Sequence, residues 1–477
     1  MQTVYPTGTT IYKPEKCYNG YILLTKSSAS KSGTVMVDMN GNEVRVWEGY
    51  EGFPNRILPG GHLMTSSRPY IGGHQGMGDL VQLDWDGNIV WKFDKWEEVD
   101  ELVMNPERGP GKPPHVPTGE KIWVARQHHD WQREGNPCGY FVPGMEPYTD
   151  KGKTLILGHQ KYVDENIHSN ELMEDVLYEV TWEGEIVWKW VFAEHFDELG
   201  FSDAAKKAIK STKAPRVDWM HINCASYLGP NRLYDQGDER FHPDNIIWDS
   251  RNANILGIID RKTGKIVWRI GPDYDASPEM EALGWIVGVH HTHMIPKGLP
   301  GEGNIMCYDN GGIAGYGEPG PMNLAKGHGQ QLNCRRDYSR VIEFDPVTLE
   351  KVWEYSPQAI GRFMWESFRE YSPYISAAQR LPNGNTLITE GALGRIFQVT
   401  PDLEIVWEFI SPYCFMMGSP PGAPPLKKES HMVYRGYLVP YEWVPQLEEP
   451  TAEEVIPPEN KQFRISGSGE NFKIHVV

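Results

Sequence analysis

The sequence lacks the long apolar runs and the leader features of membrane and exported proteins. No stretch of its 477 residues is apolar over the length of about 20 residues that a membrane-spanning helix needs. Its first residues contain no basic start followed by an apolar run and a small-residue cleavage site, so we see no signal peptide. We therefore expect a cytoplasmic protein without a membrane partner, although an exported form that had lost its signal would look the same.

Cysteine is also sparse and unclustered. The six cysteines contain no CxxC pair and no dense framework of the kind that staples small secreted domains. This pattern predicts reduced, buried thiols. The cysteines are Cys17, Cys138, Cys224, Cys307, Cys334 and Cys414.

Positive charge is in the minority, with 46 Lys and Arg against 64 Asp and Glu and a formal net charge of −18. This balance argues against nucleic acid or an anionic membrane surface as a partner. An anionic substrate would have to be attracted by a local basic site. Long helical periodicity is scarce too, whereas 49 Gly and 37 Pro supply many turns, so an all-β fold is favoured.

One short phrase recurs along the chain and predicts a β-hairpin each time. A polar or acidic turn that usually carries glycine is followed by two mostly β-branched residues, a tryptophan and a polar–aromatic pair. Residues 84–93, DWDGNIVWKF, give its clearest form. The six copies span residues 38–47, 84–93, 181–190, 260–270, 345–355 and 400–409.

Pro/Gly turns between the copies add a second hairpin to each unit, as at residues 55–64. Four antiparallel strands repeated six times predict a six-bladed β-propeller, in which each blade is a four-stranded sheet. We expect one domain over residues 1–477, with a lead-in strand in 1–30 and a strap in 444–477. The unequal spacing of the copies predicts insertions on one rim, including a short amphipathic helix over 194–212.

Histidines recur where each phrase leads into the next inner strand. When the units are aligned on the glycine of the following turn, four of six comparable positions are histidine. Inner strands line the channel of a propeller, so we expect these four to converge there. Strand alternation would send the neighbouring His128 and His290 away from the channel. The six positions hold Asn55, His129, His221, His293, Ala378 and His431.

Converging histidines suit two chemistries. Neutral imidazoles can bind iron or a divalent transition metal, with His129, His221, His293 and His431 as the ligands. Alternatively, a histidine can act as nucleophile or acid/base beside a cationic clamp. Arg340 begins a predicted strand and offers the forked donor that suits a tetrahedral oxyanion.

Four segments resemble the bacterial arylsulfate sulfotransferases that work without a nucleotide sulfate donor. They carry that family's Asp-Trp-x-His element, its second histidine strand with Asp-Asn-Gly, its Tyr-Ser-Arg strand and its C-terminal histidine element. In this chain they read DWMHIN at 218–223, THM at 292–294 with CYDNG at 307–311, YSRVIEF at 338–344 and SHMVYR at 430–435.

The resemblance implies a six-bladed propeller that moves a sulfuryl group from one phenol to another by a ping-pong reaction. His431 would attack sulfur and become a transient sulfohistidine. His221, His293 and Arg340 would hold the sulfuryl oxygens. The substrate would be a small aromatic molecule, no cofactor would be needed, and a homo-oligomer is allowed.

Two other functions stay open at this stage. The extra histidine-bearing stretch 127–137 and the run of histidines at 290–293 suit a metal-dependent lyase, hydroxyl-transferring enzyme or oxidoreductase acting on a small phenolic or other organic substrate. A propeller that only binds a partner on its rim is the third reading, although it would not need histidines in its channel.

Overall fold

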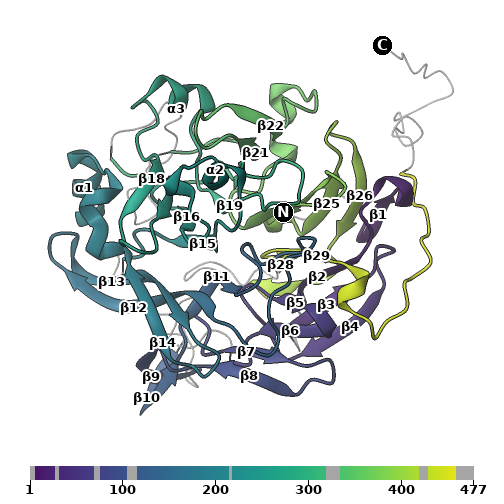
Figure 1. Cartoon of the computed structure of the whole chain (residues 1–477), viewed down its shortest axis with the longest axis horizontal. Coiled ribbons are helices and arrows are strands. Elements are labelled where there is room, and N and C mark those ends of the chain that lie inside the picture. The colour runs from purple at the N-terminus through teal and green to yellow at the C-terminus, as the bar shows by residue number, and fades with distance from the viewer. Residues whose placement is uncertain are drawn as a thin grey trace.

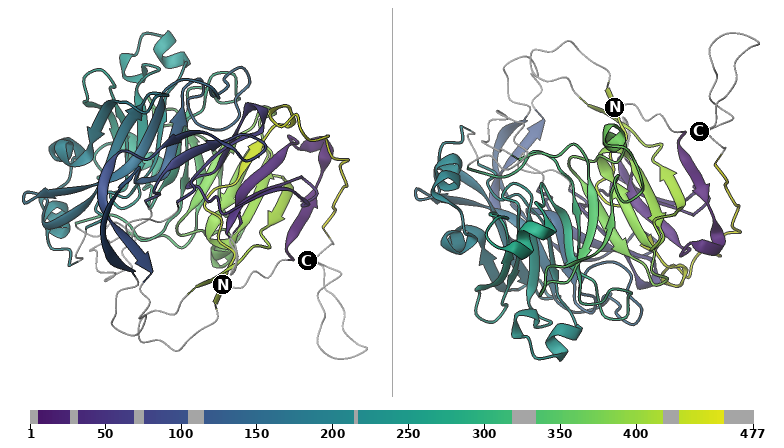
Figure 2. Two further views of the ribbon diagram at one scale, coloured as in Figure 1. Left: turned by 90° about the horizontal axis from the view of Figure 1, so that it is seen from below. Right: turned by 90° about the horizontal axis from the view of Figure 1, so that it is seen from above.

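The strands form six antiparallel sheets that stand around a common centre as the blades of a propeller (Figure 1). In this computed structural model the described residues are 6–26, 32–68, 76–104, 115–213, 217–317, 334–417 and 428–457. Figure 2 shows the same blades from below and from above. The all-β, six-bladed architecture expected from the sequence is confirmed.

The first three blades run as follows, from the innermost strand outward. Blade 1 contains β29 (Tyr437–Val439), β2 (Tyr21–Lys26), β3 (Gly33–Val37) and β4 (Glu43–Glu48). Blade 2 contains β5 (Arg56–Leu58), β6 (His62–Thr65), β7 (Leu80–Leu83) and β8 (Ile89–Phe93). Blade 3 contains β11 (Gln127–Arg133), β12 (Thr154–Asp164), β13 (His168–Val180) and β14 (Ile186–Val191).

The other three blades follow in chain order. Blade 4 contains β15 (Ile222–Tyr227), β16 (Ile246–Ser250), β17 (Ile255–Ile259) and β18 (Ile266–Ile270). Blade 5 contains β19 (His290–Met294), β20 (Ile305–Asp309), β21 (Arg340–Phe344) and β22 (Lys351–Tyr355). Blade 6 contains β23 (Ser376–Arg380), β24 (Thr386–Glu390), β25 (Arg395–Val399) and β26 (Ile405–Ile410).

Both ends of the chain take part in closing the ring. The late strand β29 pairs with β2 as the inner strand of blade 1, with Tyr437 opposite Leu23. The early strand β1 (Gly8–Tyr12) pairs with β26 as a fifth, outer strand of blade 6. The first and last blades are therefore each completed by a segment from the opposite end of the sequence.

The short helix expected within 194–212 is present, but the stretch holds two short helices separated by a turn, and no helix runs through all of it. η3 (Phe192–Leu199) ends at Gly200, whose φ of 74° begins a turn, and α1 (Asp203–Lys210) follows. The side chain of Ser202 caps α1 by accepting a hydrogen bond from the amide of Ala205. The break follows from the glycine, which ends a helix readily in the left-handed conformation.

Two short ribbons and several short helices lie outside the strands of the blades. Two ribbons are β9 (Glu97–Met104) with β10 (His115–Val124), and β27 (Phe415–Met417) with β28 (Lys428–Ser430). The remaining helices are α2 (Arg232–Asp235), α3 (Pro278–Leu283), η1 (Pro14–Lys16), η2 (Pro59–Gly61), η4 (Glu239–Phe241), η5 (Met364–Arg369), η6 (Gly391–Leu393) and η7 (Tyr441–Trp443).

The described part of the expected strap reaches back to the start of the chain. Val455 pairs with Tyr12 through two backbone hydrogen bonds of 2.8 and 2.9 Å; residues 458–477 lie outside the described part. Among the described residues no helix has the length and apolar character to cross a membrane. None of the six cysteines forms a disulfide, and four of them are buried.

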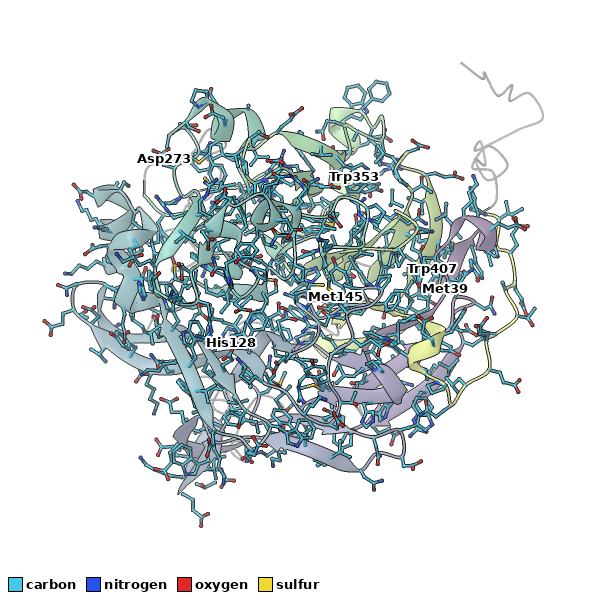
Figure 3. All side chains as sticks on the ribbon, viewed as in Figure 1. Met39, His128, Met145, Asp273, Trp353 and Trp407 are labelled. Carbon is cyan, nitrogen blue, oxygen red and sulfur yellow. The ribbon has the colours of Figure 1, made fainter. Side chains whose placement is uncertain are left out.

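Tryptophans on the outer strands connect most blades to the next one. In five of the six blades an indole N–H donates to a carbonyl in the turn that links the third and fourth strands of the following blade. Trp407 and Met39, which lie side by side in Figure 3, make this bond between blades 6 and 1. The donors and acceptors are Trp91 and Trp182 (2.8 Å), Trp190 and Gly264 (2.7 Å), Trp268 and Pro346 (2.8 Å), Trp353 and Pro401 (3.1 Å), and Trp407 and Met39 (2.8 Å).

Blade 1 makes this connection with an arginine instead. Arg45 sits opposite Met36, next to the ladder irregularity, which is the position that Trp91 holds in blade 2. Its Nη2 donates to the carbonyl of Trp85 in the turn of blade 2 at 2.6 Å. The equivalence of Trp47 with the other phrase tryptophans is therefore wrong, because Trp47 lies two residues further along β4.

Blade 3 shifts the connection by two residues. Trp188 holds the register position of Trp91, but its ring lies 4.2 Å from the guanidinium of Arg261. Trp190 makes the hydrogen bond to the next blade. The phrase therefore fixes the strand and its turn, while the residue that links the blades varies.

We expect Trp268→Phe to destabilise the protein by roughly 1–2 kcal/mol, because it leaves the carbonyl of Pro346 without its indole donor. Urea unfolding followed by fluorescence measures the change. Trp188→Phe is the matched control, since no described residue accepts a hydrogen bond from that indole. Equal losses in the two variants would contradict the proposed role of this bond.

Candidate functional site

Six residues, one from each blade, gather where the inner strands begin, at one end of the central channel. Each lies within three residues of the start of its inner strand, and the inner strands of blades 3 to 6 contact one another in sequence. We call this set the channel mouth. It consists of Phe53, His129, His221, His290, Ile375 and Tyr434.

Ring contacts join the members of the channel mouth. The rings of Phe53 and Tyr434 are 3.9 Å apart, and those of Phe53 and His129 are 4.4 Å apart. The rings of His129 and His221 are 4.8 Å apart. One side of the mouth therefore presents imidazoles and the other presents aromatic and aliphatic carbon.

Irregular backbone produces this arrangement. His129, His221 and Ile375 have positive φ values of 55°, 52° and 48°, which non-glycine residues adopt rarely. The hydrogen-bond ladders also shift register close to the histidines of the mouth: in β11 around His129, in β15 just after His221 and in β19 just after His290. Such bulges re-aim side chains and are common beside active sites, where the strain is held by the surrounding structure.

His221 is held by a carboxylate and keeps one ring nitrogen open. Its Nδ1–H donates to Oδ2 of Asp218 at 2.6 Å, and both side chains are 14% exposed. Burial opposes ionisation of Asp218, but His221 lowers the pKa of that carboxyl below its usual value. No described residue bonds Nε2 of His221, so this nitrogen is free to face a ligand.

His129 is fully buried and neutral. Burial, followed by the neighbouring His221 and His128, holds the pKa of His129 well below its usual value. Its Nδ1 lies 2.7 Å from Nδ1 of His128, so one of the two nitrogens carries the proton and the other accepts it. The hydroxyl of Tyr434 donates to the backbone carbonyl of His129 at 2.8 Å.

His290 completes the imidazole side. Its Nδ1–H donates to Oδ1 of Asn310 at 2.8 Å, and its Nε2 accepts the amide of Ile375 at 3.3 Å. Burial and the nearby Arg251 hold the pKa of His290 well below its usual value. The amide of Arg251 in turn donates to the carbonyl of His221 at 3.1 Å, which places this arginine beside both histidines.

An excess of positive charge is buried beneath the mouth. Arg56 and Arg435 share Asp130, with nitrogen–oxygen distances of 2.6 and 3.3 Å, and all three side chains are at most 2% exposed. Arg435 also donates to the carbonyl of Asn223, the second residue of β15. Two guanidinium groups and one carboxylate leave one positive charge, which favours an anion at the mouth above them.

The four histidines expected to converge do not form one cluster. His129 and His221 meet at the mouth, whereas His293 lies deeper, with Nε2 3.0 Å from the hydroxyl of Tyr140 and a pKa that burial lowers to about 4. His431 lies on the blade 6 side, where its Nδ1–H donates to the carbonyl of Ser411 at 2.9 Å.

The shared repeat position inferred for these histidines is wrong. In each blade the reference is the inner-strand residue that pairs with the first residue of the second strand. His129 lies four residues before its reference, His221 six residues before and His293 one residue before. Bulges that the sequence does not reveal cause the mismatch. The three reference residues are Arg133, Tyr227 and Met294.

The side chain of Arg340 makes its contacts with β20 of its own blade and with the loop that leads into that blade. Its Nε donates to Asp309 at 2.8 Å, and its Nη2 faces the backbone carbonyls of residues 283–285 at 3.2 to 3.5 Å. These contacts anchor the loop after α3 to β21. No contact within the described residues joins Arg340 to the channel mouth.

Sequence reasoning missed several residues of this site. Strand alternation sent His290 away from the channel, but the bulge in β19 turns it to the mouth, whereas His128 does point into blade 3 as expected. Tyr434 and Arg435 stand inside the segment 430–435 and could have been chosen from it. Arg251 has no signal in the sequence.

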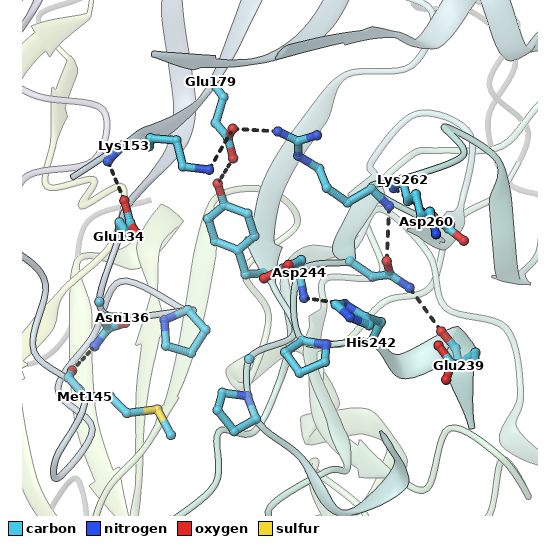
Figure 4. Close-up of a pocket in the computed structure, with 18 residues that line it drawn as sticks. Glu134, Asn136, Met145, Lys153, Glu179, Glu239, His242, Asp244, Asp260 and Lys262 are labelled. Atoms are coloured by element: carbon cyan, nitrogen blue, oxygen red, sulfur yellow. Dashed lines mark hydrogen bonds and ion pairs between the residues drawn. The ribbon is translucent and has the colours of Figure 1, made fainter. Parts of the chain in front are cut away.

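A cavity of about 870 Å³ lies between blades 3 and 4, where β11 and β15 end and therefore at the other end of the channel; Figure 4 shows the residues that line it. Two of its cations are already paired with one carboxylate, since Glu179 accepts from Arg261 at 2.6 Å and from Lys153 at 3.3 Å, as well as from the hydroxyl of Tyr227 at 2.5 Å. No member of the channel mouth lines it. The mouth is therefore the better candidate for the reactive site.

A model of the arylsulfotransferase (ASST) family matches residues 147–406, a span that includes His221, Arg251 and His290. No curated protein matches the chain.

Solved structures with distant similarity include a protein of unknown function from Bacteroides caccae (9% identity, 88% of this chain and 98% of that chain, TM-score 0.40). Others are virginiamycin B lyase from Staphylococcus aureus (12%, 85% and 85%, 0.33) and the β-propeller domain of Myceliophteria thermophila Cps50 (8%, 87% and 89%, 0.35).

The buried carboxyl of Asp249 should make the stability of the folded protein depend on pH. Burial raises the pKa of Asp249 from 3.8 to about 7. The folded protein therefore keeps a proton that the unfolded chain releases, and stability should fall as pH rises from about 4 through about 7. We expect Asp249→Asn to flatten this dependence in urea midpoints measured across that range; an unchanged slope would contradict it.

Proposed function

The chain belongs to the arylsulfotransferase family, and on that premise we propose that it transfers a sulfuryl group between phenolic compounds at the channel mouth, through a histidine intermediate. The observation that carries the proposal is the pairing of His221 with Asp218 at 2.6 Å, which leaves Nε2 open beside a second imidazole. A histidine held at Nδ1 by a carboxylate is well suited to move a proton at Nε2.

The two sides of the mouth match the two parts of an aryl sulfate. Phe53, Tyr434 and Ile375 belong to one apolar cluster and offer carbon surface to an aromatic ring. The buried excess charge of Arg56 and Arg435, together with Arg251, favours the sulfate group. No carboxylate among the described residues forms an ion pair with Arg251, so its guanidinium can turn to an anion.

His431 is the proposed nucleophile, on the basis of the family element that it carries. Its Nδ1–H is bound to the carbonyl of Ser411, which keeps the lone pair of the neutral ring on Nε2. In the first half-reaction Nε2 attacks sulfur, the bond between sulfur and the aryl oxygen breaks, and protonated His221 gives its Nε2 proton to the departing phenolate. Asp218 stabilises the imidazolium before transfer.

The second half-reaction reverses these steps with another phenol. Neutral His221 takes the proton of the acceptor hydroxyl, the phenolate oxygen attacks sulfur, and the nitrogen–sulfur bond to His431 breaks. Both histidines return to their starting states. Arg251 and the buried guanidinium groups stabilise the negative charge on the sulfuryl oxygens in both halves.

The alternative of a metal-dependent enzyme with His129, His221, His293 and His431 as ligands is not favoured. Among the described residues, none of these four belongs to a group of three donors close enough to share an ion.

We expect the protein to release phenolate from 4-nitrophenyl sulfate and to pass the sulfuryl group to an added phenol with ping-pong kinetics. Asp218→Asn should lower kcat by about 100-fold or more, because it removes the charge that fixes the His221 proton. His431→Gln should abolish transfer and the acid-labile gain of one SO3 group seen in the intact mass of wild type.

His195→Gln provides the control, since His195 lies on η3 and pairs with Glu198 away from the mouth. Its activity should match wild type. A fully active His431→Gln enzyme would rule out His431 as the nucleophile, and absence of phenolate release by wild type with any aryl sulfate would rule out the reaction.

A pair of arginine variants tests where the sulfate group binds. Arg251→Gln should raise KM for the aryl sulfate about tenfold or more, since a charge-assisted hydrogen bond is worth about 1.5–3 kcal/mol. Arg340→Gln should instead lower the thermal midpoint, because Arg340 holds Asp309 and the loop after α3. A rise in KM confined to Arg340→Gln would place the sulfate elsewhere.

A further inference from the structure

Three metal-binding side chains meet inside blade 3, directly behind the channel mouth. His128 on β11, His159 on β12 and Asp175 on β13 come from three successive strands, and all three side chains are at most 2% exposed. One nitrogen or oxygen of each lies within 4.8 Å of the other two. Among the described residues this is the one such group of His, Cys, Asp or Glu.

Both imidazoles present the same edge to one oxygen. Nε2 of His128 lies 3.2 Å from Oδ1 of Asp175, and Nε2 of His159 lies 3.4 Å from that same atom. The two rings stack with centroids 3.6 Å apart and planes 16° apart. Two nitrogens and one oxygen therefore face a common point in the interior.

Hydrogen bonding alone does not satisfy this group. Nε2 of His128 and Oδ1 of Asp175 are buried, and neither makes a hydrogen bond of regular geometry, although the two atoms lie 3.2 Å apart and the imidazoles favour the ionised carboxylate. An unsatisfied buried donor or acceptor costs about 1–3 kcal/mol. Such atoms persist in folded proteins where an ion or another group completes them.

The distances suit a shared cation. Ligand atoms that each lie about 2.0–2.2 Å from a four-coordinate zinc are roughly 3.3 Å from one another. The separations of 3.2 and 3.4 Å match this edge length. Because a ligating lone pair lies in the plane of its ring, we expect binding to turn the two stacked edges toward the ion.

We propose that His128, His159 and Asp175 bind one divalent transition-metal ion, such as Zn²⁺, as a site built into blade 3. Two imidazoles and a carboxylate form a borderline donor set that suits zinc, iron, manganese or cobalt. The second oxygen of Asp175 is already held by the amide of Ile222 at 3.0 Å, which fixes the carboxylate and joins blade 3 to blade 4.

One hydrogen bond connects the proposed metal site with the channel mouth. A metal on Nε2 of His128 leaves its proton on Nδ1, which lies 2.7 Å from Nδ1 of His129. His129 then accepts at Nδ1 and carries its own proton on Nε2, as a donor at the mouth. This consequence rests on the proposed sulfuryl transfer, where such a donor would bind a sulfuryl oxygen; the metal site does not.

Metal analysis of the full-length protein tests the proposal without any substrate. Tag-free protein stripped with a chelator and dialysed against Zn²⁺ should hold one ion per chain by mass spectrometry of the metal. Asp175→Asn and His159→Ala should lose it, whereas His195→Ala should keep it. Zn²⁺ should also raise the thermal midpoint of wild type but not that of Asp175→Asn.

Wild-type protein that retains neither Zn²⁺ nor Co²⁺ after dialysis would overturn the proposal, and so would folded Asp175→Asn that still binds one ion. Circular dichroism checks that the variants are folded. Because metal content is read without a reaction, a protein that binds zinc but transfers no sulfuryl group would refute the proposed function and leave this site in place.

Discussion

The propeller depends on one recurring hydrogen bond, which runs from the outer strand of each blade to the turn of the next. Five indoles and the guanidinium of Arg45 make it, at 2.6 to 3.1 Å. A single blade cannot bury both of its faces, so each blade packs against its neighbours. These hydrogen bonds and the closure of the ring by β29 and β1 set the angle at which neighbouring blades pack. That angle decides which residues of the inner strands face one another across the channel.

Bulges at the starts of the inner strands then decide which side chains reach the channel mouth. A regular ladder would place alternate side chains in the channel, whereas the positive φ values at His129 and His221 bring neighbouring imidazoles to the same mouth. Behind them, blade 3 holds a compact pair of imidazoles on Asp175, and beneath them lie Arg56 and Arg435. The ring thus brings the His221–Asp218 pair, a buried excess of positive charge and an aromatic surface to one opening.

The repeat and the blade count could be read from the sequence, because hydrophobic alternation and Asp/Gly turns are local signals. The site could be read only in part. His221 was found from its motif, and His129 was included through a repeat alignment that the strand registers do not support. His290 and Arg251 were missed, because their positions depend on the register shift in β19 and on the path between β16 and β17. Such shifts depend on contacts between blades, and no short sequence pattern encodes them.

The central claim is that the channel mouth binds the sulfuryl group beside His221 and Asp218. A crystal structure with a bound aryl sulfonate, which resembles the substrate but keeps its carbon–sulfur bond, tests it most directly. The account predicts the sulfonate oxygens next to Nε2 of His221 and the guanidinium of Arg251, with the aromatic ring against Phe53. A sulfonate bound only in the cavity at the opposite end, beside Arg261 and Lys153, would contradict it.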